Sequence, residues 1–170
     1  MSATSTASAP RSDTELPPVV KEIVVALPPA EAFALFTAHV SKWWPATPYS
    51  CFQADCLRIE FEPRAGGVVT EIARDGRTAP WGTIVDWDPP HRFSMTWHPG
   101  SERAQATLLE VAFAPAAAGG SRIRLVHSGW MARGEQAPAV REGYDGGWVR
   151  VLQSYAEAAA AQAGGEGTTS

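Results

Sequence analysis

His127 is the polar side chain in this sequence that is best placed to do chemistry. It shares strand parity with Ile123 and Leu125, so we expect its imidazole to point into the interior. An inward imidazole beside aromatic side chains can orient a ligand, or exchange protons near neutral pH. A second interpretation stays open, in which the ring nitrogens only form structural hydrogen bonds with a neighbouring hydroxyl or backbone carbonyl. We identify no catalytic partner for it.

Aromatic residues supply the other candidate site. The chain has seven tryptophans. Such side chains provide large apolar contact areas and have few rotatable bonds, so little conformational entropy is lost when they bind a ligand. Together with His127, the candidate ligand-binding residues are Trp81, Trp97, Trp130, Tyr144 and Trp148. The alternative is that these rings fill the core, and it applies most directly to the two that lie in predicted strands.

The remaining reactive side chains lack the spacing of a known site. We expect His39, His91 and His98 to lie on the surface, and Cys51 and Cys56 to be reduced thiols. The sequence contains no nucleophile triad, phosphate loop, metal cluster or dinucleotide fingerprint. We therefore predict no cofactor and no metal, and an enzyme is the weaker hypothesis.

The elements that position these residues follow from hydrophobic periodicity. A first strand is predicted over 19–27, followed by a short helix after Pro28-Pro29 and a helical turn over 41–44. From Cys51 onward the period is two, which predicts strands joined by short turns. The residues expected on one face of successive strands are Leu57, Ile59 and Phe61; Trp81, Thr83, Val85 and Trp87; Phe93, Met95 and Trp97; Thr107, Leu109, Val111 and Phe113; and Ile123, Leu125 and His127. This order indicates an antiparallel meander.

The last element is an amphipathic helix. Its apolar stripe consists of Tyr144, Trp148, Val151, Tyr155 and Ala158. Such a helix must lie across the concave face of the sheet to bury this stripe. Trp43, in a connecting segment, is expected to matter less to folding than Trp148.

Composition limits the domains and partners. We expect one domain over 19–163, flanked by disordered polar tails over 1–18 and 164–170. The net charge of −4 and the lack of a basic stripe argue against nucleic acid. No signal peptide or membrane span is recognised, so we expect a cytoplasmic protein. The sequence does not predict the oligomeric state.

Several separated motifs resemble one family. They are 62–67 (EPRAGG), 81–85 (WGTIV), 89–97 (PPHRFSMTW), 125–130 (LVHSGW) and 147–152 (GWVRVL). In this order they are similar to homologues of the activator of heat-shock-protein-90 ATPase, the AHSA-type family of the SRPBCC (START and birch-pollen-allergen-like) superfamily. The resemblance covers roughly 19–160. It implies an α+β helix-grip fold, in which a curved antiparallel sheet wraps around a long C-terminal helix.

The resemblance implies three functions. The leading one is binding of a small apolar or aromatic ligand between the sheet and the C-terminal helix. The second is a cyclase or dehydratase that uses the same cavity. The third is a protein-interaction module of the chaperone-activator type, which is least expected because a short polar tail stands here in place of the activators' N-terminal domain.

Overall fold

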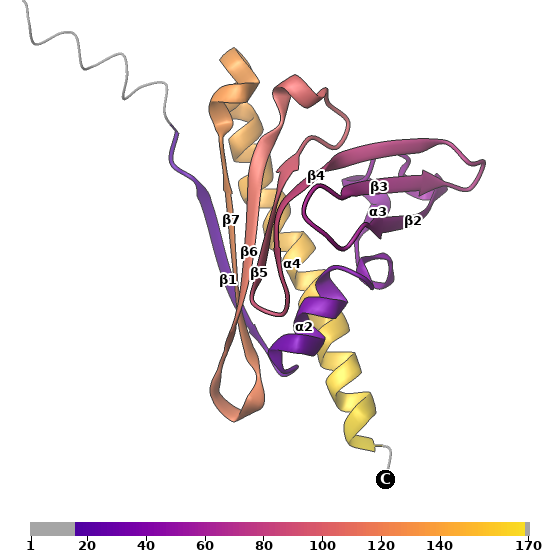
Figure 1. Ribbon diagram of the computed structural model, residues 1–170, viewed down its shortest axis with the longest axis vertical. Coiled ribbons are helices and arrows are strands. Elements are labelled where there is room, and N and C mark those ends of the chain that lie inside the picture. Colours follow the sequence, from indigo (N-terminus) through magenta and orange to yellow (C-terminus); the bar gives the residue numbers. More distant parts are fainter. Residues whose placement is uncertain (1–15, 169–170) are drawn as a thin grey trace, which may run out of the picture.

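A seven-stranded antiparallel sheet curls around one long C-terminal helix in the computed structural model, which describes residues 16–168 (Figure 1). The strands are β1 (Val19–Val25), β2 (Cys56–Phe61), β3 (Val68–Ala73), β4 (Thr78–Asp88), β5 (Arg92–Trp97), β6 (Thr107–Pro115) and β7 (Ser121–Ser128). Their order is β1-β7-β6-β5-β4-β3-β2, so β2 to β7 form a meander and β1 pairs with β7 at its end. The predicted helix-grip α+β fold is confirmed.

Helical segments fill the connection between β1 and β2. They are α2 (Pro29–Phe36), a 3-10 turn over Val40–Lys42, α3 (Ala46–Tyr49) and a 3-10 turn over Gln53–Asp55. Proline in the first turn of α2 suits the dihedral needed at a helix start. Phe33 and Phe36 of α2 are buried against Phe113 of β6, with ring centroids 5.1 and 5.8 Å away. This connection therefore packs on the sheet and helps to enclose the core.

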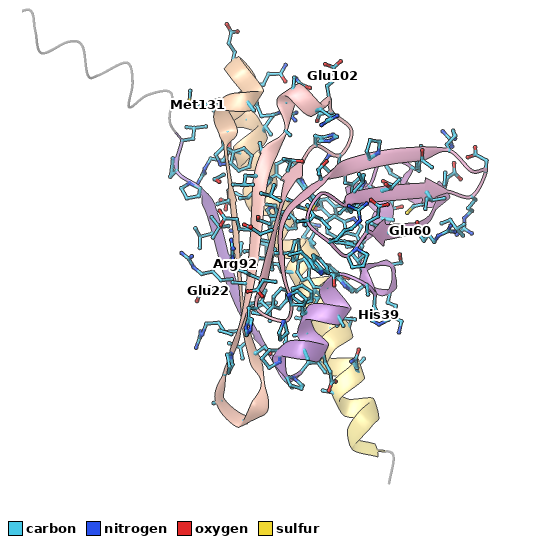
Figure 2. All side chains as sticks on the ribbon, in the orientation of Figure 1. Glu22, His39, Glu60, Arg92, Glu102 and Met131 are labelled. Atoms are coloured by element: carbon cyan, nitrogen blue, oxygen red, sulfur yellow. The ribbon has the colours of Figure 1, made fainter. Side chains whose placement is uncertain are left out.

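The long helix α4 (Ala137–Thr168) buries the predicted stripe. Trp148, Val151 and Tyr155 are buried, whereas Arg150 and Glu157 are exposed. The Tyr155 hydroxyl donates to the backbone carbonyl of Ala32 at 2.8 Å, which ties α4 to α2. In Figure 2, side chains fill the space between sheet and helix, while the labelled carboxylates lie at the periphery.

Trp43 is more deeply buried than expected for a residue of a connecting segment. It is only 4% exposed, and its indole N–H donates to the carbonyl of Leu35 at 2.8 Å. Its ring lies 5.0 Å from Tyr155 and 5.1 Å from Phe36, measured between centroids. Trp43 thus belongs to the core, because the connecting segment folds back under α4.

The strict alternation expected in β2 and β4 is also wrong. Val85 is 51% exposed and Leu57 is 48% exposed, whereas Trp81 and Ile84 are both buried. The pairing register shifts around Trp81 in the β3–β4 pair, between Ile84 and Asp86 in the β4–β5 pair, and beside Cys56 in β2. A bulge of this kind inserts a residue and turns the following side chains to the opposite face.

Gly82 belongs to the same irregular part of β4. A Cβ atom at this position would lie 1.8 Å from the backbone oxygen of Thr96. Only glycine permits that approach of β4 to β5.

The structure also describes chain on both sides of the expected domain limits. Leu16 packs against the core, and the Arg141 side chain donates to the carbonyls of Pro17 and Pro18 at 2.6 and 3.1 Å. At the other end α4 continues to Thr168, past the predicted limit at 163. The rest of the predicted N-terminal tail, 1–15, lies outside the described residues. None of the described helices is long and apolar enough to cross a membrane.

Candidate ligand-binding pocket

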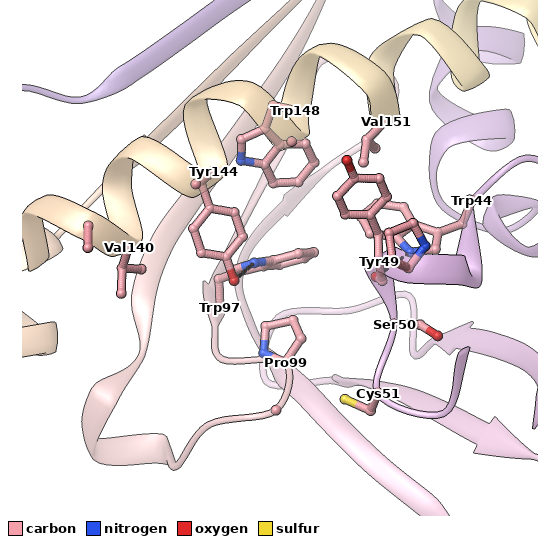
Figure 3. Close-up of a pocket in the computed structure, with 15 residues that line it drawn as sticks. Trp44, Tyr49, Ser50, Cys51, Trp97, Pro99, Val140, Tyr144, Trp148 and Val151 are labelled. Atoms are coloured by element: carbon pink, nitrogen blue, oxygen red, sulfur yellow. Dashed lines mark hydrogen bonds between the residues drawn. The ribbon is translucent and has the colours of Figure 1, made fainter. Parts of the chain in front are cut away.

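A pocket of about 330 Å³ opens between the first half of α4, α3 and the segment that follows β5. Five aromatic side chains line it: Trp44, Tyr49, Trp97, Tyr144 and Trp148 (Figure 3). The described residues of its wall include no Asp, Glu, Lys or Arg. The pocket is thus an aromatic and uncharged space, with a volume in the range of small-molecule sites.

Small residues of α4 make room for this space. Ala139, Gly143 and Gly147 recur every fourth residue and all line the pocket, so they lie on one helix face. A Cβ atom at Gly147 would lie 3.4 Å from Cε1 of Tyr49. Larger side chains along this face would therefore occupy the pocket.

Trp44 forms the inner wall opposite α4. Its indole N–H donates to the carbonyl of Tyr49 at 2.9 Å, and its ring centroid lies 4.9 Å from Trp81 and 6.0 Å from Trp148. Behind Trp44, Trp97 and Trp148 is a second, wholly apolar cavity of about 10 Å³. These three tryptophans separate the two spaces because they line both.

His127 lies behind the pocket wall and is 0% exposed. Its Nδ1 accepts the Trp148 indole N–H at 3.0 Å, and its Nε2 lies 2.6 Å from the Thr107 hydroxyl. Because an indole nitrogen can only donate, Nδ1 is unprotonated and Nε2 carries the hydrogen. Thr107 then accepts from Nε2 and donates to the carbonyl of Trp97 at 3.2 Å.

The protonation state of His127 follows from this environment. Burial, and secondarily the charge of Arg133, lowers the pKa of His127 from 6.5 to about 3. The ring is therefore neutral at physiological pH. It is also fully hydrogen-bonded, as in the second interpretation drawn from the sequence.

The structure separates the predicted site residues into two groups. Trp97, Tyr144 and Trp148 line the pocket. Trp81 lines the small inner cavity, and neither His127 nor Trp130 is among the residues that line the larger pocket. Trp130 is buried with its ring centroid 4.3 Å from His127, and its indole N–H has no partner among the described residues.

Sequence reasoning missed Trp44, Tyr49 and Cys51 as lining residues. The adjacent pair Trp43-Trp44 was the available signal, since neighbouring side chains point in different directions; Trp43 is buried in the core, whereas Trp44 packs against it and is half-buried. It also placed His98 on the surface, which is wrong. His98 is 4% exposed, because the turn after β5 folds over it and the Ser101 carbonyl lies 3.2 Å from Nδ1.

Glu71 of β3 is a buried carboxylate that the strand pattern did not single out. It is 0% exposed and accepts hydrogen bonds from the backbone N–H groups of Cys51 and Phe52, at 2.8 and 2.9 Å, and from the Trp81 indole at 2.9 Å. Burial alone would raise the pKa of Glu71, but these donors outweigh it and hold that pKa below its usual value. Glu71 thereby fixes the chain at Cys51, on the pocket wall.

The two cysteines flank this carboxylate and are both free. Burial, followed by the charge of Glu71, raises the pKa of the Cys51 and Cys56 thiols to about 11. Both thiols remain protonated at neutral pH, so neither has the thiolate character of a nucleophile.

Comparison with known proteins gives a consistent family and fold. Residues 26–159 match the family model described as Activator of Hsp90 ATPase homolog 1-like protein. The chain is similar to Txn09, an anthrahydroquino-gamma-pyrone synthase solved in complex with a ligand denoted SUM, with 35% identity over 78% of this chain and 89% of that one and a TM-score of 0.55. No curated protein sequence matches the chain.

Two further solved structures share the fold. The Aha1 dimer from Colwellia psychrerythraea is 13% identical, with 85% of this chain and 96% of that one covered and a TM-score of 0.59. Protein MLL2253 from Mesorhizobium loti is 17% identical, with 82% and 94% covered and a TM-score of 0.61.

Proposed function

Given that the chain belongs to the family of Activator of Hsp90 ATPase homolog 1-like proteins, we propose that it binds a small, uncharged aromatic molecule in the pocket between α3 and α4. The observation that supports this proposal is the composition of the wall, to which the described residues contribute five aromatic side chains and no charged one around a space of about 330 Å³. Rings of this kind stack on a planar ligand, and an uncharged ligand enters without an unpaired ion.

The face of α4 that carries small residues also favours a planar ligand. Ala139, Gly143 and Gly147 line one side of the space, and the rings of Trp44 and Trp97 line others. A flat molecule can lie along the smooth helix surface and contact these rings at the same time. A bulky or branched molecule gains less contact in such a slot.

Binding of fluorene, followed by quenching of tryptophan emission, tests the proposal. We expect saturable binding to the wild-type protein. The Gly147→Leu variant should weaken it by about fivefold or more, since overpacking a filled space costs about 1 to 3 kcal/mol. Gly146→Leu is the matched control, because Gly146 is exposed and a Cβ atom there would meet nothing within 4 Å.

Two outcomes contradict the proposal: no saturable binding by the wild type, or equal binding by the Gly147→Leu and Gly146→Leu variants. Native mass spectrometry of freshly purified protein complements this assay. It identifies the molecule if the natural ligand remains bound during purification.

A synthase or cyclase is the second candidate, favoured by the 35% identity to Txn09. The ionisable groups whose pKa is shifted in this pocket, Cys51 and Tyr144, both have raised pKa values, so both stay protonated at neutral pH and neither can act as a base. Proton abstraction would need a base that the described wall lacks. Recovery of a bound ligand unchanged after prolonged incubation would favour binding, and a change in its mass would favour catalysis.

A further inference from the structure

Tyr144 carries a hydrogen-bond donor for which the described residues offer no acceptor. The Trp97 indole N–H donates to the Tyr144 hydroxyl oxygen at 3.2 Å, as the dashed line in Figure 3 shows. An indole nitrogen cannot accept, so the direction of this bond is fixed and the hydroxyl hydrogen must find an acceptor elsewhere. Among residues 16–168, no acceptor for this hydrogen is present within hydrogen-bond distance.

The hydroxyl is held in one place by its neighbours. The Tyr144 ring makes an edge contact with His127, with centroids 4.6 Å apart, and lies nearly parallel to Trp148 at 6.3 Å. His127 is in turn fixed by its two hydrogen bonds to Trp148 and Thr107. The donor is therefore preorganised, and little conformational entropy is lost when a ligand accepts from it.

Tyr144 also keeps its hydrogen over a wide pH range. Burial raises the pKa of Tyr144 above its ordinary value, although the hydrogen bond from Trp97 opposes part of this effect. The other two hydroxyls of the wall are placed differently. In Figure 3 the Ser50 hydroxyl points away from Tyr144, and the Tyr49 hydroxyl lies beside Val151.

We infer that the pocket selects planar aromatic ligands that carry an uncharged oxygen acceptor, such as a ring carbonyl, and that Tyr144 donates the hydrogen bond that orients them. This inference rests on the proposed function and adds the chemical class of the ligand. A carbonyl oxygen has two lone pairs and no charge, which suits one neutral donor in an otherwise apolar space. A purely hydrocarbon ligand would displace water from this half-buried donor and leave it unpaired.

Fluorene and 9-fluorenone provide the test, because they have the same three-ring skeleton and differ by a CH2 group in place of a carbonyl. Tryptophan quenching is measured for both probes with the wild-type protein and with Tyr144→Phe. We expect the wild type to prefer 9-fluorenone by about two- to tenfold, the range of one neutral hydrogen bond. Tyr144→Phe should bind both probes with similar affinity.

The carbonyl stretching frequency of bound 9-fluorenone is a second measurement that needs only the wild type. A hydrogen bond from Tyr144 should lower this frequency relative to 9-fluorenone in an apolar solvent, so the test survives if Tyr144→Phe does not fold. Equal affinities of the wild type for both probes, an unchanged preference in Tyr144→Phe, or an unshifted carbonyl band would overturn the inference while leaving the proposed pocket intact. Failure of both probes to bind the wild type would overturn the proposed function and this inference together.

Discussion

The indole N–H of Trp148 donates to Nδ1 of His127 at 3.0 Å, and this bond links the wall of the pocket to a fully buried polar residue of β7. Because the indole can only donate, it sets the histidine tautomer, while burial keeps the ring neutral. The Thr107 hydroxyl and the Trp97 carbonyl extend the chain of hydrogen bonds, so both ends of it belong to pocket-lining tryptophans. His127 is thus a positioning residue for the aromatic wall.

Replacing His127 by Phe should destabilise the fold. The Trp148 indole would lose its acceptor inside the core, and a buried unpaired donor costs about 1 to 3 kcal/mol. His127→Gln should cost less, because an amide can accept from Trp148 and donate to Thr107. Urea denaturation followed by circular dichroism checks the order, and equal midpoints for the wild type and His127→Phe would contradict it.

The pH dependence of stability should also report His127. Its pKa is 6.5 when unfolded and about 3 when folded, so only the unfolded chain takes up the proton as pH falls below 6.5. The stabilisation is therefore complete above pH 6.5 and is lost as pH falls toward 3. Between pH 7 and pH 5 this should amount to about 2 kcal/mol.

The slope of stability against pH should flatten in His127→Gln and persist in the control His91→Gln, since His91 is exposed. The measurement is the free energy of unfolding at several pH values between 5 and 7. An unchanged slope in His127→Gln would show that His127 is not neutral in the folded protein.

Glu71 should be needed as a carboxylate rather than as an amide. All three of its partners are N–H donors, so the NH2 group of Glu71→Gln must face at least one of them. We expect a loss of about 1 to 3 kcal/mol in the free energy of unfolding. Fluorene binding should also weaken, because Glu71 no longer fixes the backbone at Cys51 on the pocket wall. The exposed Glu60→Gln substitution is the control and should change stability by less than about 0.5 kcal/mol.

Protonation of Glu71 at low pH should destabilise the fold, as the Glu71→Gln substitution does. Because its folded pKa lies below the usual value, it stabilises the fold above that value, and this contribution is lost as pH falls through the folded pKa. The wild type should therefore lose stability in this acid range more steeply than Glu71→Gln. Parallel curves for the two proteins would contradict an ionised Glu71.

Trp44 should limit the size of the ligand. Trp44→Ala would join the pocket to the small apolar cavity behind it, because Trp44 lines both. We expect this variant to bind the larger probe pyrene better relative to fluorene than the wild type does, as measured by tryptophan quenching. Trp43→Ala is the contrasting variant: it should cost about 3 to 5 kcal/mol in stability through the core. An unchanged ratio of the two affinities in Trp44→Ala would rule out this role.

The residues just before β1 should contribute modestly to stability. Deletion of 1–18 removes Leu16 from the core and the two carbonyls that accept from Arg141, whereas deletion of 1–15 leaves them in place. We expect the longer deletion to melt a few degrees below the shorter one, corresponding to about 1 kcal/mol. Identical melting temperatures would show that these contacts do not stabilise the domain.

The hydrophobic periodicity of the sequence determined most of the fold. The alternation of Phe93, Met95 and Trp97, and the helical spacing of Trp148, Val151 and Tyr155, were sufficient to predict the fold, since each period allows only one face to be buried. The inward direction of His127 followed from the same parity argument. Family motifs spread along the chain then identified the helix grip.

Tertiary structure alone decided which buried rings face the pocket. Periodicity reports that a side chain is on the inner face, but it does not distinguish a ring packed against other rings, as with Trp130, from one beside empty space, as with Tyr144. Bulges in β4 turned Val85 outward, and the connection after α2 brought Trp44 to α4, because both depend on contacts between segments distant in sequence. The unused hydrogen of Tyr144 likewise became evident only once Trp97, 47 positions away, was seen to occupy its oxygen.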